Sequence, residues 1–229
     1  HLSQKRKSVN DRAPMKAPSN RVRFAVTLAL FAALGLFAWK SGRKVYDQGP
    51  GLEMTQAGGA VVLRWAHPVE APMAERFAEA FADWKDRTGR FVIELDSPGG
   101  ALVEGRLVIG EIERMKATHQ IDTRVGAGAD CLSMCVPIYL AGEQRSAAGN
   151  ARFMFHEPSS HDLVTDEKVS RPGFEQKMTA DKFFERYFAN SRMNPEWREK
   201  LRASWRGRDL WFTAEELAQQ GSGVVERVE

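Results

Sequence analysis

The chain has 229 residues, 43% of them hydrophobic and 28% charged, which is typical of one globular domain with an appendage and excludes a disordered chain. Its net charge of +3 is uneven, because seven basic side chains and one acidic side chain give residues 1–23 a charge of +6, so the rest carries −3. A slightly acidic domain lacks the basic surface that binds nucleic acid, so we exclude a nucleic-acid partner.

The first 60 residues divide into three segments of different composition. Residues 1–23 are polar and basic, and predict a disordered cytoplasmic tail. Residues 24–39 are an uncharged run, FAVTLALFAALGLFAW, bounded by Arg23 and Lys40. Residues 40–60 hold five glycines and one proline, a composition that favours a flexible tether.

The apolar run predicts a single N-terminal transmembrane helix. As a helix it reaches about 24 Å, a little short of a hydrocarbon core of roughly 30 Å, and the flanking Arg23 and Lys40 can cover the difference by snorkelling. The positive-inside rule then anchors the chain in the inner (cytoplasmic) membrane, with the domain in the periplasm or outside. The alternative is a cleaved signal that yields a secreted protein.

The domain over residues 61–229 begins with a strand over 61–65. Apolar spacing predicts helices over 72–87, 102–116 and 134–141, and strands over 91–95, 121–125 and 153–155. This alternation predicts an α/β fold with a largely parallel sheet. Residues 157–173 lack periodicity and predict an exposed loop.

Two further helices are expected toward the C-terminus. Residues 174–190 form a long helix rich in aromatics, which belong either to the core or to a subunit interface. Thr213 and Glu216 form a capping box that begins the last helix.

Two turns carry candidate catalytic groups. Gly99 and Gly100 follow a strand, where glycines let the main chain approach a ligand and present an N–H to an oxyanion, although any strand-to-helix turn can use glycine. Ser133 precedes a helix, where unpaired N–H groups favour negative charge. It is therefore either a nucleophile, with the Met134 N–H as an oxyanion donor, or a plain N-cap.

His156 and Asp209 are the candidate base and its orienter. His156 ends an apolar strand and is either a general base or a structural histidine, and His161 in the following loop is a rival base. Asp209 either orients the base or pairs with Arg208 on the surface.

Cys131 and Cys135 flank Ser133 and are the only cysteines of the chain. In an exported protein they can form a disulfide, and the alternative is two small buried hydrophobic residues. A separation of four residues does not by itself meet the geometry of a disulfide. We expect no metal site here, because no histidine lies at ligand spacing from the pair.

The order of these motifs resembles the proteolytic subunit of the Clp protease and its ClpP/crotonase-fold relatives, in an exported, membrane-anchored branch. The resemblance covers residues 91–228 and rests on the Ser-Pro-Gly-Gly turn at 97–100, Leu-Ser-Met at 132–134, the strand 150–156, and Arg-Asp at 208–209 before the capping box. It implies a repeated β-β-α spiral, a homo-oligomer with residues 174–190 as its interface, polypeptide substrates, and no metal or organic cofactor.

Carried over position by position, the resemblance implies roles for five residues. Ser133 is the nucleophile, His156 the base and Asp209 the orienter, and Gly100 and Met134 supply the oxyanion hole. We therefore expect a membrane-anchored serine endopeptidase that works through an acyl-enzyme. The alternatives are a catalytically inactive ClpP-fold assembly or binding protein, and an esterase or crotonase-type acyl enzyme.

Overall fold

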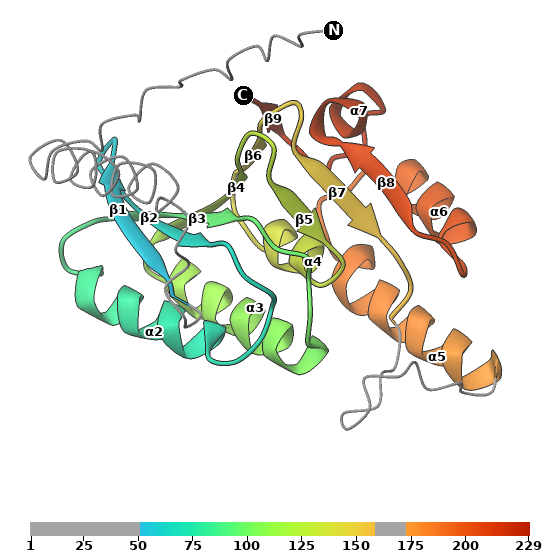
Figure 1. Cartoon of the computed structure of the whole chain (residues 1–229), viewed down its shortest axis with the longest axis horizontal. Helices are drawn as coiled ribbons and strands as arrows, with labels where there is room; N and C mark the ends of the chain where they lie inside the picture. Colours follow the sequence, from blue (N-terminus) through green and yellow to red (C-terminus); the bar gives the residue numbers. More distant parts are fainter. Residues whose placement is uncertain (1–50, 159–172) are drawn as a thin grey trace, which may run out of the picture. The chain divides into compact units, whose positions relative to one another are not determined.

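A computed structural model describes residues 51–158 and 173–229 (Figure 1). The expected basic tail and transmembrane segment, and the rival base His161, lie outside these residues. Across the two described ranges, no helix is both long and apolar enough to cross a membrane. The described residues belong to one compact unit that begins at Gly49.

The larger of two sheets has six strands in the order β1-β2-β3-β4-β6-β9. These strands are β1 (Glu53–Ala57), β2 (Ala60–Trp65), β3 (Arg90–Leu95), β4 (Gln120–Val125), β6 (Arg145–Ala147) and β9 (Arg227–Val228). All neighbours are parallel except the antiparallel hairpin of β1 and β2. In β3 the alternate residues Phe91, Ile93 and Leu95 are buried, as a strand with one covered face requires. The largely parallel sheet expected from the alternation of elements is confirmed.

Two helices cross between the parallel strands and pack against each other: α2 (Met73–Trp84) and α3 (Leu102–Lys116). Figure 1 shows both on the same side of the larger sheet. In α2 the buried residues Met73, Phe77 and Ala80 recur at helical spacing and face the core. The loop between β3 and α3 contains the two glycines of the candidate site.

The smaller sheet has three strands in the order β5-β7-β8, with β5 parallel and β8 antiparallel to β7. Its strands are β5 (Asp130–Leu132), β7 (Arg152–Phe155) and β8 (Leu210–Thr213). The remaining helical elements are α4 (Cys135–Leu140), α5 (Gly173–Phe184), the π-helical turn η2 (Glu185–Ala189), α6 (Pro195–Ser204) and α7 (Ala214–Gln219). Thr213 and Glu216 cap α7 reciprocally, so the predicted capping box is confirmed.

The structure differs from the expectations at two places. Strand β1 lies within the segment expected to be a flexible tether; its side chains are all exposed, so its polar composition is compatible with an edge strand paired to β2. In the expected interface helix, Phe184 and Phe188 are 1% and 2% exposed and contact Trp205. These two aromatics therefore belong to the core of the protomer.

Candidate active site

Ser133 occupies a tight turn between β5 and α4. Its φ of 53° makes it the only non-glycine with positive φ in the described part of the chain. This left-handed conformation is disfavoured for a residue with a Cβ, so the surroundings must hold it. The Ser133 N–H donates to the Met154 carbonyl at 2.9 Å, which joins the turn directly to β7.

His156 follows β7 and therefore lies beside the same turn. Its Nε2 is 2.6 Å from Ser133 Oγ, the distance of a hydrogen bond between a base and a nucleophile. The His156 side chain is 26% exposed, so solvent and ligands reach it. The structure thus brings together the two residues that the sequence placed 23 positions apart.

Asp209 immediately precedes β8, which pairs with β7 so that Leu210 lies opposite Phe155. This pairing brings Asp209 toward His156, with 4.0 Å between Asp209 Oδ1 and His156 Nδ1. That distance suits an ion pair but exceeds a hydrogen bond. The Asp209 side chain is also 63% exposed, so the orienter is held less tightly than the base.

The glycine turn after β3 lies against the serine turn. A Cβ on Gly99 would lie 2.6 Å from both Ser133 Cβ and the Leu132 carbonyl oxygen, so only glycine fits at this approach. Among the described residues, neither the Gly100 N–H nor the Met134 N–H has a hydrogen-bond acceptor. Of these two sequence-predicted oxyanion donors, Gly100 is exposed, whereas Met134 is fully buried.

Ser97 belongs to the Ser-Pro-Gly-Gly turn of the sequence analysis, which gave it no role of its own. Its backbone N–H donates to the Asp130 carbonyl at 2.7 Å, and its carbonyl accepts from the Leu132 N–H at 3.0 Å. Its buried Oγ accepts from the Gly99 N–H at 3.2 Å. Ser97 therefore connects the glycine turn to β5. A serine two residues before a glycine is the sequence signal that could have predicted the hydrogen bond from the Gly99 N–H to its hydroxyl.

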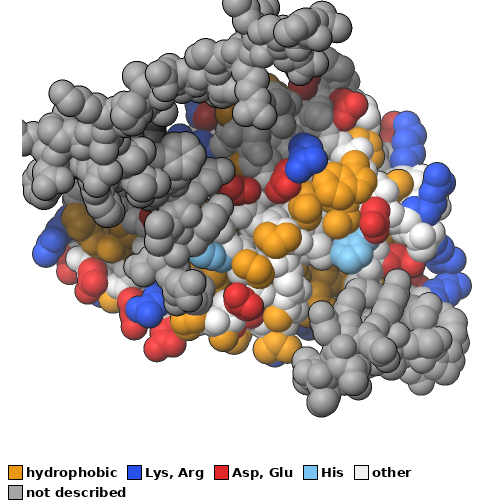
Figure 2. All heavy atoms as spheres, viewed as in Figure 1, with side chains coloured by type: hydrophobic (Ala, Val, Ile, Leu, Met, Phe, Trp, Pro, Cys, Tyr) orange, Lys and Arg blue, Asp and Glu red, His pale blue; other side chains and the backbone are white. Residues whose placement is uncertain are grey.

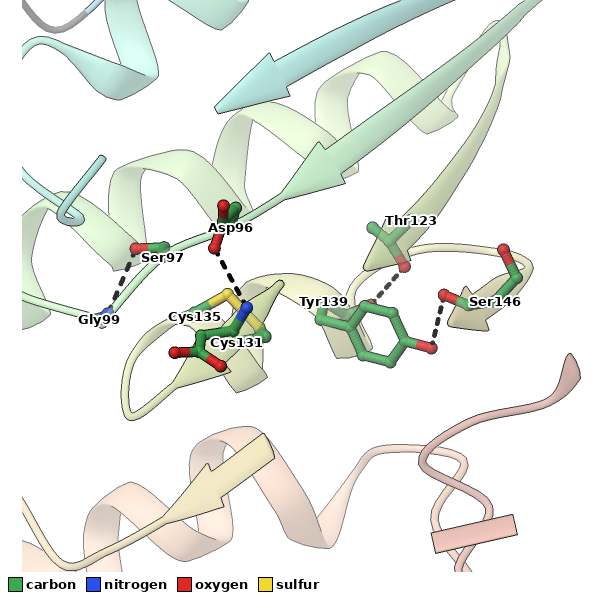
Figure 3. Close-up of a disulfide and its surroundings, with 9 residues drawn as sticks. Asp96, Ser97, Gly99, Thr123, Cys131, Cys135, Tyr139 and Ser146 are labelled. Carbon is green, nitrogen blue, oxygen red and sulfur yellow. Dashed lines mark hydrogen bonds between the residues drawn. A yellow bond between two sulfur atoms is a disulfide. The ribbon is translucent and has the colours of Figure 1, made fainter. Parts of the chain in front are cut away.

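The structure contains a disulfide between Cys131 in β5 and Cys135, the first residue of α4. The two Cα atoms are 5.2 Å apart and both side chains are fully buried. Figure 3 shows the bond beside the segment that carries Asp96 and Ser97, where Asp96 Oδ1 accepts from the Asp130 N–H at 3.1 Å. The cysteines thus bracket the serine turn.

Two surface features lie on elements that adjoin the site residues along the chain. An open groove of about 740 Å³ begins at Leu102 and Val103, close to Gly100, and also reaches Pro158, two residues after His156. Residues of α5 and η2 form its other wall. Figure 2 shows hydrophobic side chains over the smaller sheet, where Trp211 is 49% exposed.

Burial shifts the pKa of two groups outside the candidate triad. Burial lowers the pKa of the Arg145 guanidinium and raises the pKa of the Tyr139 hydroxyl. The described ranges contain no group of three or more His, Cys, Asp or Glu side chains that could hold a metal ion. The site itself places a serine hydroxyl next to an imidazole.

Comparisons with known proteins identify the family and the fold. The family model described as Clp protease matches residues 61–228. A solved structure, a ClpP1 mutant from Listeria monocytogenes, superposes with a TM-score of 0.55 at 17% identity, covering 73% of this chain and 90% of the other. At this identity the likeness concerns the fold alone. No curated protein matches the sequence.

Proposed function

The chain belongs to the Clp protease family, and from this premise we propose that it is a serine endopeptidase that uses Ser133, His156 and Asp209. The observation that carries this proposal is the 2.6 Å contact between His156 Nε2 and Ser133 Oγ. A serine hydroxyl becomes a nucleophile when an adjacent base can take its proton. The left-handed backbone of Ser133 supports the same role, because such strain concentrates at functional sites.

The proposed reaction proceeds through an acyl-enzyme. Ser133 Oγ attacks the peptide carbonyl carbon while His156 Nε2 accepts the hydroxyl proton. The N–H groups of Gly100 and Met134 donate to the developing oxyanion. His156 then gives its proton to the leaving amine, and a water molecule, deprotonated by the same imidazole, releases the acid. Asp209 stabilises the imidazolium, and no metal or organic cofactor takes part.

The substrates in this proposal are flexible polypeptide segments. The groove between α3, α5 and η2 combines apolar side chains, such as Val103 and Phe183, with charged ones, such as Arg106 and Asp181. Such a surface accepts an extended peptide of mixed sequence. The chain functions as a homo-oligomer, for which Leu107 of α3, exposed and apolar and outside the groove, offers a contact.

We further propose that residues 24–39 anchor the protein in the inner membrane and that the domain faces the periplasm or the exterior. The basic residues before this run support the orientation. The disulfide between Cys131 and Cys135 supports it as well, since structural disulfides persist in oxidising compartments. Secretion after signal cleavage is the alternative that also exports the domain.

Hydrolysis of an unfolded polypeptide tests the proposed activity. Full-length protein in detergent should cleave reduced, carboxymethylated casein, and mass spectrometry should find new internal termini. Ser133→Ala should abolish these products while leaving the circular dichroism spectrum unchanged. Equal cleavage by the wild type and Ser133→Ala would contradict the proposal.

One observation favours a second candidate, a non-catalytic binding protein of the same family. Asp209 lies 4.0 Å from His156 and is largely exposed, so the orienter makes no hydrogen bond with the imidazole at that distance. A binding protein would hold unfolded polypeptide without cleaving it. In that case Ser133→Ala would leave both peptide binding and the cellular phenotype intact.

A further inference from the structure

The disulfide between Cys131 and Cys135 spans the three residues of the serine turn. Cys131 lies in β5, where it pairs with Phe153 of β7, and Cys135 begins α4. Ser133 lies midway between them with its strained φ of 53°. The covalent bond therefore joins the end of the strand to the start of the helix across the candidate nucleophile.

The hydrogen bonds of the turn restrain each side of Ser133 separately. On the strand side, the Leu132 N–H donates to the Ser97 carbonyl and the Ser133 N–H donates to the Met154 carbonyl. On the helix side, the Val136 N–H donates back to the Ser133 carbonyl at 3.0 Å. The disulfide adds a second covalent link between these two sides, beside the main chain, so it further limits how far they can separate.

One of the two proposed oxyanion donors lies inside the segment that the disulfide spans. The Met134 N–H belongs to this spanned turn, and Gly99, the neighbour of Gly100, lies against the turn. A shift of α4 relative to β5 would therefore displace the Ser133 hydroxyl and the Met134 N–H together. Catalytic groups must be held to about 0.5 Å of the productive geometry to keep their full effect.

We propose that the Cys131–Cys135 disulfide is a positioning element of the active site, and that the protein is fully active only while this bond is closed. This inference rests on the proposed serine peptidase function. Reduction by a dithiol would break the sulfur–sulfur bond, add one hydrogen to each cysteine sulfur, and convert the dithiol into its own disulfide. Reoxidation by a disulfide compound would reverse the change and restore activity.

The composition of the chain makes this proposal directly testable. Cys131 and Cys135 are its only cysteines, so every thiol-dependent change must pass through them. The matched control is the double variant Cys131→Ala/Cys135→Ala, which has no bond to reduce. Because both sulfurs are buried, reduction is verified by counting free thiols in denaturant after each treatment.

The experiment measures acylation of full-length protein by a fluorophosphonate probe, before and after treatment with dithiothreitol. A displacement of roughly 1 Å can lower a rate about 100-fold. We expect reduction to cause a smaller displacement and therefore to lower the first-order acylation rate constant about tenfold. The half-saturating probe concentration should stay the same, and glutathione disulfide should restore the rate. The double variant should resemble the reduced protein and should not respond to dithiothreitol.

The outcomes separate this inference from the proposed function. If the reduced chain and the folded double variant acylate as fast as the oxidised protein, the positioning role is overturned and the peptidase remains. If reduction unfolds the domain, the bond is a general staple and the inference fails. If the double variant does not fold, the acylation rate constants of the oxidised and reduced wild type are compared alone, and equal values overturn the positioning role. An oxidised, folded chain that is never labelled contradicts the proposed function itself.

Discussion

At the scale of single residues, the site depends on close backbone approaches more than on charge. The Ser133 hydroxyl contacts His156 because the backbone N–H of Ser133 donates to the carbonyl of Met154, two residues before the histidine. Gly99 lies so near this turn that no larger residue fits at its position. The three candidate triad residues therefore differ in how firmly they are held, and Asp209 is the loosest.

The unequal hold on the triad predicts unequal losses of activity. We expect His156→Ala to lower kcat by roughly 10⁶-fold and Asp209→Ala by roughly 10⁴-fold or less, following the sizes seen when a base or an orienter is removed from a serine protease. The loss at Asp209 should be the smaller one because its carboxylate is 4.0 Å from the imidazole. Steady-state kinetics on a peptide substrate measure both values. A larger loss for Asp209→Ala than for His156→Ala would contradict this ranking.

Gly99→Ala should damage the site directly. The new Cβ would collide with Ser133 Cβ and the Leu132 carbonyl, and the φ of 88° disfavours alanine. We expect loss of acylation and a fall of about 1–3 kcal/mol in the free energy of unfolding.

Gly110→Ala is the matched control for this variant. Gly110 lies in α3, where a Cβ meets nothing within 4 Å. Its replacement should raise the free energy of unfolding by about 0.5–1 kcal/mol. Urea unfolding and probe labelling of both variants test the pair, and full activity of Gly99→Ala would refute the close approach.

At the scale of elements, the smaller sheet and α5 to α7 form the body that carries His156 and Asp209. Phe155 of β7 contacts Phe188, Trp197 and Phe212, so the strand before His156 is anchored in an aromatic cluster. The position of His156 therefore depends on the packing of this aromatic cluster.

Phe184→Ala should destabilise the protomer itself. Phe184 is 1% exposed and its ring centroid lies 5.3 Å from Trp205 and 5.4 Å from Phe188. We expect a loss of about 3–5 kcal/mol, the usual cost of deleting a buried aromatic side chain. Met178→Ala on the exposed face of the same helix should change stability by about 0.5 kcal/mol or less. Equal melting temperatures for the two variants would show that Phe184 is not a core residue.

Arg145→Met should loosen the C-terminal segment. The buried Arg145 guanidinium donates to the Val224 and Gly223 carbonyls at 3.0 and 2.8 Å and pairs with Glu226. Burial lowers its pKa while Glu226 opposes that shift, so the arginine stays charged and bonded. We expect a loss of about 3 kcal/mol, because two carbonyls lose their donor.

Arg76→Met is the control for the Arg145 variant. Arg76 forms an exposed ion pair with Glu79 on α2. Such pairs contribute about 0–1 kcal/mol, so this variant should unfold close to the wild type in urea. An Arg145→Met protein as stable as Arg76→Met would contradict the role of the buried network.

The elements also show what the sequence could and could not predict. Hydrophobic periodicity was sufficient to predict β3, α2 and α3, and the Leu-Ser-Met motif at 132–134 predicted the serine turn. Strand β5 was missed because it has three residues and pairs with β7, about 20 residues later in the chain. Helix α6 was missed although Asn194 caps it and Pro195 begins it, a signal that was present in the sequence. The separation of Asp209 from His156 depends on long-range packing and leaves no local pattern.

In the whole molecule, a domain of the Clp protease family follows an N-terminal segment of different composition. The domain over residues 61–228 matches the Clp protease family, whereas the basic tail and apolar run precede it. The combination predicts a peptidase that works outside the cytoplasm. There a disulfide beside the nucleophile remains closed.

This localisation predicts the behaviour of a reporter fused after Glu229. Alkaline phosphatase folds only where its own disulfides form, so a fusion at the C-terminus should be active in a bacterial host. Deleting residues 24–39 should abolish reporter activity, because the domain would then stay in the cytoplasm. A fusion that is inactive with the apolar run in place would contradict export.

The most direct test of the central claim is labelling of the folded, oxidised full-length chain with a fluorophosphonate probe, beside Ser133→Ala and His156→Ala. We predict one label per chain, on the peptide that contains Ser133, and loss of this label in both variants. Absence of labelling in the folded wild type, or labelling that persists in Ser133→Ala, would contradict the assignment of Ser133 as the activated nucleophile.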